Sequence, residues 1–184
     1  LDSFSSLPPS VTCHEIEPHV LKRISFLTTP NQVLALAPLP QPVATTFDKA
    51  LLLDGIQDPG NLGSIIRIAD WYGIPAVYTN TTCADVFHPK VVQASMGSIF
   101  RVNLLQQELL PLLQDPDAPP SYAAVLGGAD INTCPAVSSG YLVIGSEARG
   151  LQPAISAACN RAVKQPAASA RSPRRPSAST RMRS

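Results

Sequence analysis

Leu51-Leu-Leu-Asp-Gly-Ile-Gln-Asp-Pro-Gly-Asn-Leu-Gly-Ser-Ile-Ile-Arg-Ile-Ala-Asp-Trp-Tyr72 passes from an apolar run through a polar, glycine-rich turn into an amphipathic pattern. Three consecutive leucines ended by Asp54-Gly55 indicate a short strand that is covered on both faces. After the turn, apolar residues recur at spacings of three and four, which predicts a helix with one buried face. Such strand-to-helix turns are where α/β proteins place binding groups.

A second segment, Tyr141-Leu-Val-Ile-Gly-Ser-Glu-Ala-Arg-Gly-Leu151, has the same design: an apolar run and then a polar, glycine-containing turn. Across the region between and around the two segments, the patterns alternate between strand and helix. This alternation predicts an α/β fold with a parallel sheet and helices on both faces. The expected strands are 50–54, 75–79, 99–104, 121–127 and 141–145, and the expected helices are 62–72, 89–95, 106–114 and 151–158.

Composition is that of an ordinary globular protein. The 184 residues are 45% apolar, enough for one sizeable core. No apolar stretch approaches the roughly 20 residues that span a bilayer, and the first residues lack the pattern of a signal peptide, so we expect a cytoplasmic protein without a membrane segment. The four cysteines form no C-x-x-C pair, and we expect neither a disulfide framework nor a metal site.

Charge is divided sharply along the chain. Residues 1–150 hold seven Lys or Arg and all 13 Asp or Glu, whereas residues 151–184 hold seven basic residues and no acid, which gives the net charge of +1. We expect 46–160 to form the main domain. We expect the tail 161–184, rich in Arg, Pro, Ser and Ala, to be disordered; a polybasic tail of this kind could also bind RNA phosphates.

The two turn segments, with Gln93-Ala-Ser-Met-Gly-Ser-Ile-Phe-Arg-Val102 between them, resemble the SpoU/TrmH family of RNA ribose 2′-O-methyltransferases, in the knotted class of AdoMet-dependent enzymes. The resemblance spans about residues 48–160. It implies a C-terminal trefoil knot, S-adenosyl-L-methionine (AdoMet) as cofactor, rRNA or tRNA as substrate, and a homodimer. The first family pattern matches at Asp54, Asp58, Pro59, Asn61, Gly63 and Arg67, and the second at Gly145, Ser146, Glu147, Gly150 and Leu151.

The same resemblance implies roles for individual residues. Asn61 and Arg67 would face the RNA; they lie about 9 Å apart along a helix axis, and we expect both to border one pocket. Arg67 is the expected catalytic residue, acting by orientation and phosphate binding because a guanidinium hardly deprotonates. Glu147 is either catalytic or a structural cap, and Arg149 is either an RNA contact or a solvated surface charge. Main-chain groups of Gly145, Ser146, Gly150 and Leu151 would contact AdoMet, with Gly127 near its adenosine and Val163 in the wall of its site.

The C-terminus departs from the family. The segment 161–166 begins like the family's next strand, but residues 167–184 contain nothing like the third motif, of the type Glu-Ser-Leu-Asn-Val-Ser. We therefore hypothesise a frameshift or truncation near Lys164 to Pro166. If the tail is as written, we expect weak or absent AdoMet binding and no turnover. The alternative function is a catalytically inactive RNA-binding remnant of the fold.

Residues 1–45 form a partial N-terminal segment and linker. Ile16, Val20, Leu21 and Ile24 have helical spacing, and the apolar end of 28–37 is typical of a strand. The segment resembles half of the small ribosomal-protein-like RNA-binding domain that precedes many family members; a simple extension is the alternative. A dinucleotide-binding turn is excluded, because the glycines at Gly60 and Gly63 do not fit G-x-G-x-x-G.

Overall fold

The computed structural model describes residues 7–8, 10–27, 29–39 and 46–165, and the chain divides into two compact units, 1–40 and 41–184. In the first unit, helix α1 (Pro18–Ile24) confirms the predicted helical spacing, but none of its residues is buried. The strand predicted at the end of 28–37 is wrong, since residues 34–37 belong to no strand. An extended segment needs a neighbouring strand for its backbone hydrogen bonds, and none pairs with it among the described residues.

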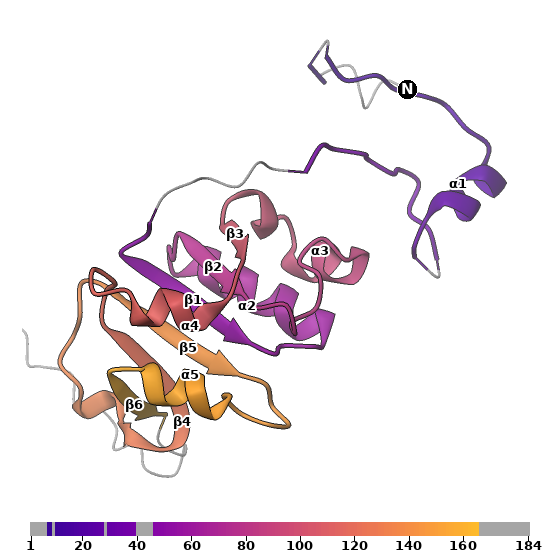
Figure 1. Ribbon diagram of the computed structural model, residues 1–184. Coiled ribbons are helices and arrows are strands. Elements are labelled where there is room, and N and C mark those ends of the chain that lie inside the picture. Colours follow the sequence, from indigo (N-terminus) through magenta and orange to yellow (C-terminus); the bar gives the residue numbers. More distant parts are fainter. Residues whose placement is uncertain (1–6, 9, 28, 40–45, 166–184) are drawn as a thin grey trace, which may run out of the picture. The chain divides into compact units, whose positions relative to one another are not determined.

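The second unit is built on a parallel sheet, shown in Figure 1. In the described part of the chain the sheet has six strands in the order β3-β2-β1-β5-β4-β6, and every neighbouring pair is parallel. The predicted α/β class is thereby confirmed, while the knot stays a prediction. The strands are β1 (Lys49–Asp54), β2 (Ala76–Thr79), β3 (Asn103–Gln106), β4 (Ser121–Asp130), β5 (Gly140–Gly145) and β6 (Arg161–Lys164).

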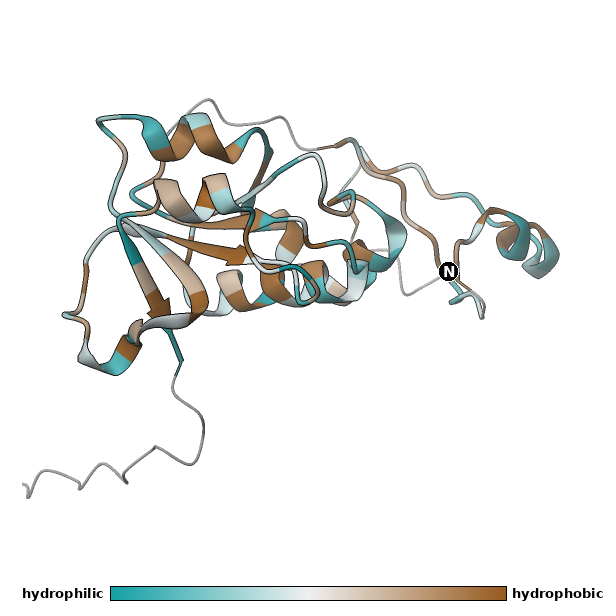
Figure 2. Cartoon of the chain, turned by 60° about the horizontal axis from the view of Figure 1, so that its bottom comes forward, coloured by the Kyte–Doolittle hydropathy of each residue, from teal (hydrophilic) through white to brown (hydrophobic). Residues whose placement is uncertain are grey.

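Helices cover both faces of this sheet. Helices α2 (Pro59–Trp71) and α3 (Pro89–Ser95) share one core with Leu51 and Leu53 of β1. Helices α4 (Leu109–Gln114) and α5 (Pro153–Ala158) share the other core with Leu52. Side chains alternate between faces along a strand, so the leucine run supplies both layers. Figure 2 shows the hydrophobic residues concentrated on the strands and on parts of the covering helices.

Helix α2 begins three residues before the predicted start at 62. Asp58 is its N-cap, and its Oδ1 accepts a hydrogen bond from the main-chain N–H of Asn61 at 2.7 Å. Pro59 occupies the first helical position, where a missing N–H is harmless. The helix therefore starts immediately after the polar turn and carries Asn61 in its first turn.

Only the last two residues of the predicted strand 99–104 belong to a strand. Ser98–Phe100 forms a short 3-10 helix, η2, and β3 begins only at Asn103. Met96 and Gly97 both have left-handed backbone angles, which turn the chain sharply after α3. Apolar residues at 99 and 100 gave the strand pattern, but the turn before them prevents pairing there.

The tail also needs a correction at its start. Residues 161–164, expected to be disordered, form β6, which pairs with β4 in the register Ala123 to Ala162. The sheet therefore continues past 160, as the strand-like opening of this segment indicated. The rest of the predicted basic tail and the missing third motif lie outside the described residues. No helix in the described ranges is long and apolar enough to cross a membrane.

Candidate functional site at the ends of β1 and β5

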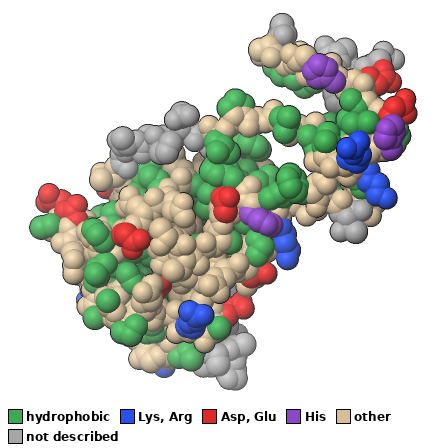
Figure 3. Space-filling model, turned by 45° about the vertical axis from the view of Figure 1, so that its right-hand side comes forward, with side chains coloured by type: hydrophobic (Ala, Val, Ile, Leu, Met, Phe, Trp, Pro, Cys, Tyr) green, Lys and Arg blue, Asp and Glu red, His purple; other side chains and the backbone are tan. Residues whose placement is uncertain are grey.

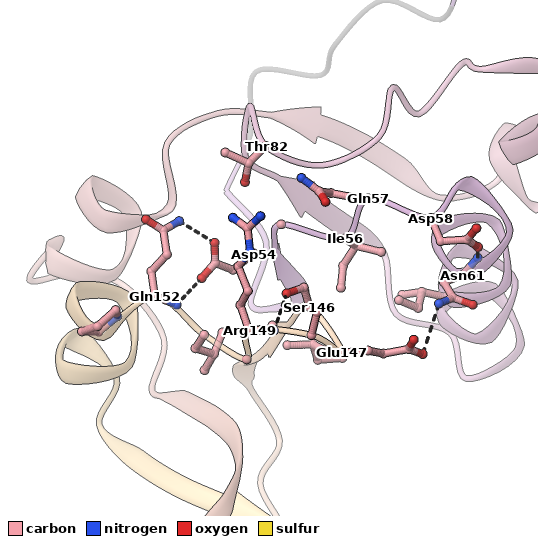
Figure 4. Close-up of a pocket in the computed structure, with 18 residues that line it drawn as sticks. Asp54, Ile56, Gln57, Asp58, Asn61, Thr82, Ser146, Glu147, Arg149 and Gln152 are labelled. Carbon is pink, nitrogen blue, oxygen red and sulfur yellow. Dashed lines mark hydrogen bonds between the residues drawn. The ribbon is translucent and has the colours of Figure 1, made fainter.

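A cavity of about 640 Å³ opens where β1 and β5 end, and Figure 4 shows its lining. The two strands are parallel neighbours, with Asp54 opposite Gly145 in the last rung of their ladder. The turns that follow them therefore emerge side by side. The two segments singled out in the sequence supply most of the wall, which consists of residues 54–58, Asn61, Ile65, Thr82 and 144–153.

Asn61 and Glu147 connect the two turns directly. The side-chain Nδ2 of Asn61 donates a hydrogen bond to Oε1 of Glu147 at 3.1 Å (Figure 4). Both side chains are exposed at the cavity. The carboxylate of Glu147 is thus aimed at the first turn of α2, and the choice between a catalytic residue and a structural cap stays open.

The loop after β5 folds back on its own beginning. The carbonyl of Ser146 accepts from the N–H of Gly150 at 2.8 Å, and the Ser146 hydroxyl accepts from the N–H of Arg149 at 3.2 Å. A Cβ atom on Gly145 would lie 2.2 Å from the carbonyl carbon of Gly150. A glycine is therefore required at position 145 because the loop folds back against it, whether or not a ligand also contacts it. Gly150, at φ +68°, has open space where a side chain would be.

Asp54 lies beneath this loop and is only 2% exposed. Its Oδ2 accepts from the main-chain N–H of Gln152 at 2.7 Å, and its Oδ1 accepts from Nε2 of Gln152 at 2.7 Å and Nδ2 of Asn80 at 2.8 Å. Sequence reasoning singled out neither Gln152 nor Asn80. The sequence marks these residues only by their positions: Gln152 follows the second motif, and Asn80 follows β2.

Arg67 does not border the cavity, which corrects the expectation of a shared pocket with Asn61. It is exposed on α2. Six residues advance an α-helix by one turn and two thirds, so Arg67 points about 120° away from Asn61 around the helix axis. Arg149, in contrast, is exposed in the loop and lines the cavity.

Gly127 and Val163 also lie outside the cavity lining. Gly127 is exposed in β4, with nothing within 4 Å of the position of a Cβ atom. Val163 is buried in β6, and its backbone passes so close to Gly128 that a Cβ there would lie 2.5 Å away. The ladder between β4 and β6 is irregular at this point, because Val163 pairs with both Ala124 and Ala129.

The charges and shape of the site fit a cationic ligand of moderate size. The volume is within the roughly 300–1,000 Å³ of small-molecule sites. Its wall contains three carboxyl groups, of Asp54, Asp58 and Glu147, against the single guanidinium of Arg149. AdoMet carries a sulfonium cation, and bare main chain at Gly150 permits close approach. These residues therefore fit AdoMet chemically.

Cys83 packs behind the site as a structural thiol. Its Sγ donates to the carbonyl of Leu53 at 3.2 Å and accepts from the N–H of Ile56 at 3.3 Å. Burial raises the pKa of this thiol, which disfavours the reactive thiolate. Within the described ranges, no group of three or more His, Cys, Asp or Glu residues is placed to hold a metal ion.

Comparison with known sequences gives consistent matches. Over 154 residues the chain is 30% identical to the 23S rRNA (guanosine(2553)-2′-O)-methyltransferase RlmP of Bacillus subtilis, covering 82% of this chain and 62% of that protein. Over 109 residues it is 35% identical to human mitochondrial rRNA methyltransferase 3, covering 53% and 26%. The chain thus spans less than two thirds of the length of these relatives.

Solved structures agree with the sequence matches. A TrmH-family protein from Porphyromonas gingivalis superposes with a TM-score of 0.70 at 40% identity, covering 88% of this chain and 64% of that one. The SpoU methyltransferase AviRb from Streptomyces viridochromogenes, in complex with the cofactor AdoMet, gives a TM-score of 0.59 at 27% identity, covering 76% and 56%. The model of the SpoU rRNA methylase family matches residues 48–172, past the last described residue. With both motif turns in one cavity and this match over most of its length, the chain belongs to the SpoU rRNA methylase family.

Proposed function

We propose that this protein transfers a methyl group from AdoMet to a ribose 2′-hydroxyl of rRNA or tRNA. The observation that carries the proposal is the convergence of the two motif turns on one cavity, with Asn61 of the first bonded to Glu147 of the second. Family membership and the RNA methyltransferase relatives support the same chemistry. We propose residues 46–164 as the catalytic domain and 1–45 as a separate N-terminal segment.

Bound AdoMet supplies an electrophilic methyl group, and the protein has to hold and orient the groups around it. We propose that main-chain groups of the loop from Gly145 to Leu151 bind the cofactor, because Gly150 has open space where a side chain would lie. Gly127 is our candidate for the adenosine contact, since its main chain is exposed in β4. Val163 would support that wall from within β6.

The RNA side of the reaction falls to the first motif. The side-chain amide of Asn61 can donate and accept, so it can orient a ribose hydroxyl while it is bonded to Glu147. The carboxylate of Glu147 is acceptor-only when ionised, and it can take the proton that the ribose hydroxyl gives up when its oxygen is methylated. We propose that Arg149 at the cavity and Arg67 on the outer side of α2 bind RNA phosphates.

We also propose that the protein forms a homodimer. We further propose that it acts on RNA in the cytoplasm. Support for self-association comes from the C-terminal end of α2, where the large side chains of Ile68, Trp71 and Tyr72 are exposed. Figure 3 shows hydrophobic side chains at several places on one face of the molecule. Exposed apolar groups of this size favour protein contacts. Sedimentation of the purified chain and of Trp71→Lys tests this directly: loss of a dimer in the variant is expected, and a monomeric parent protein contradicts it.

The activity test offers the protein two matched substrates. An RNA fragment that accepts label in total RNA, and the same fragment with 2′-deoxyribose at the labelled nucleotide, are incubated with methyl-labelled AdoMet. A 2′-O-methyl group blocks alkaline cleavage at its linkage, so label should appear in alkali-resistant dinucleotides from RNA only. The Asn61→Ala variant should lose this label. Label in the deoxy substrate would contradict the ribose hydroxyl as acceptor, and RNA binding without any transfer would indicate the inactive remnant.

A further inference from the structure

We infer that Asp54 is a positioning residue of the proposed methyl transfer, one that fixes the loop 146–152 from below. The inference rests on the proposed function and deepens it by naming what shapes the cofactor side of the cavity. Asp54 accepts three hydrogen bonds, and two of them come from Gln152, at the far end of the loop. Figure 4 shows both links from Gln152 to the carboxylate.

The loop is anchored at both ends to the same rung of the sheet. It leaves the sheet at Gly145, which pairs with Asp54 in the ladder between β1 and β5. It returns to Asp54 at Gln152, immediately before α5 begins at Pro153. The residues between these two ends, Glu147 among them, form a loop that lines the cavity. Without the bonds to Asp54, the second end would lose its hydrogen bonds to the sheet and keep only the packing of Leu151 and Ile155 in the core with Leu52.

The three hydrogen-bond donors around position 54 require an acceptor at each of its two side-chain oxygens, which a carboxylate provides. An ionised carboxylate is acceptor-only at both oxygens, and here Oδ1 and Oδ2 are both used. The main-chain N–H of Gln152 cannot be turned away from Oδ2. The amide of Asn80 is fixed too, because its own Oδ1 accepts from the N–H of Gly55 at 3.1 Å and the hydroxyl of Thr82 at 2.8 Å. A carboxamide at position 54 would therefore place an NH₂ group against at least one donor.

Burial of the Asp54 carboxylate carries a desolvation cost. Asp54 is 2% exposed, and the ion pairs among the described residues, Lys90 with Asp58 and Arg101 with Asp70, do not include it. Its partners are neutral donors, which compensate a buried charge less well than a cation does. A purely structural contact could be made with less desolvation by apolar packing. Position 54 nevertheless requires a carboxylate, and this carboxylate lies under a loop that lines the cavity. We therefore attribute it to the need to hold that loop in one geometry.

The experiment compares Asp54→Asn with Asp48→Asn. Asp48 is exposed and precedes β1, so the control makes the same chemical change at the opposite end of the same strand. Gln152→Ala is the second variant: it removes the side-chain link and keeps the main-chain link, and its exposed position makes failure to fold unexpected. Each protein is measured by amide hydrogen exchange across 146–152, by urea unfolding, and by calorimetric binding of AdoMet.

We expect Asp54→Asn to speed exchange in 146–152 and to weaken AdoMet binding by about tenfold or more, because small displacements at a site have effects of that size. Gln152→Ala should give a smaller change of the same kind, and Asp48→Asn none. The urea midpoint should follow the parent protein in Asp48→Asn and nearly so in Gln152→Ala, whereas in Asp54→Asn it should fall, because the carboxamide leaves a buried donor facing another donor. Unchanged exchange of the loop in both Asp54→Asn and Gln152→Ala overturns the inference, as does faster exchange spread evenly over β1, β2 and β5. If the parent protein binds no AdoMet, the proposed function fails, while the exchange comparison still decides the role of Asp54.

Discussion

Asn61 and Glu147, 86 residues apart in the chain, are joined by a hydrogen bond of 3.1 Å between the side-chain amide of one and the carboxylate of the other. This bond crosses from the first turn of α2 to the loop that follows β5. Because both side chains are exposed, it adds little to stability. Its effect is to hold two groups of the cavity wall at a fixed separation, which is what a positioned reaction requires.

Replacing either partner should therefore separate activity from stability. Asn61→Ala and Glu147→Ala are each expected to lower methyl transfer at least about tenfold, in line with the loss of a positioned polar group, with free energies of unfolding within about 0.5 kcal/mol of the parent protein. The double variant should lose less than the sum of the single losses, because the two side chains act together. Glu108→Ala, an exposed carboxylate away from the cavity, is the control. Additive losses would show that the two residues act independently.

Alanine substitutions at two glycines of the loop after β5 should differ in their effects on AdoMet binding and on stability. Gly145→Ala puts a Cβ 2.2 Å from the main chain of Gly150, so the loop has to open and AdoMet binding should be lost. Gly150→Ala meets no atom, but its backbone at φ +68° disfavours any side chain by about 1 kcal/mol. Calorimetric binding and urea unfolding of both variants test the distinction. Equal loss of AdoMet binding in the two would contradict it.

Gly127 and Gly128 form a neighbouring pair for testing the irregular edge of the sheet. A Cβ on Gly128 would lie 2.5 Å from the backbone of Val163, and Gly128→Ala should lower the free energy of unfolding by about 1–3 kcal/mol, as overpacking does. Gly127→Ala meets open space and should stay within about 0.5 kcal/mol. If Gly127 contacts adenosine as proposed, its variant should weaken AdoMet binding while it leaves the urea midpoint in place.

The pair of Arg101 and Asp70 predicts a pH-dependent contribution to stability. Hydrogen bonds from Arg101, and secondly from the hydroxyl of Ser98, hold the pKa of Asp70 below its ordinary value of 3.8. A carboxyl whose pKa is lower in the folded than in the unfolded protein stabilises the fold above its ordinary pKa. That contribution disappears as the pH falls through the folded-state value.

Arg101→Met should accordingly lower the urea midpoint at pH 7, and its difference from the parent protein should shrink as the pH falls from about 5 toward 2. Lys90→Met serves as the control, because the amine of Lys90 lies 4.0 Å from Asp58 and both side chains are more than half exposed. It should have little effect at any pH. A difference for Arg101→Met that is the same at pH 7 and pH 3 would contradict the pair as its cause.

The sequence predicted well those features that depend on local pattern. The leucine run gave a strand with two buried faces, and the turns after β1 and β5 gave the cavity. It failed where three-dimensional neighbours decide. Phe100 has a strand-like context but follows two left-handed residues, so the 3-10 helix forms there instead. Arg67 shares a motif with Asn61 but points to another side of the same helix. Gln152 and Asn80 acquire their roles only because Asp54 lies buried between them.

The strand order has a consequence for how the protein folds. Strands β1, β2 and β3 are consecutive along the chain and adjacent in the sheet, and β4 lies between β5 and β6, so each half can assemble from nearby segments. Within the sheet, the halves are joined at the ladder between β1 and β5, in which Leu51 pairs with Leu142. Closing so long a loop makes this a slow, non-local step. The cavity lies across that seam, so it cannot exist in a half-folded chain, and the appearance of ligand binding during refolding would time the docking of the two halves.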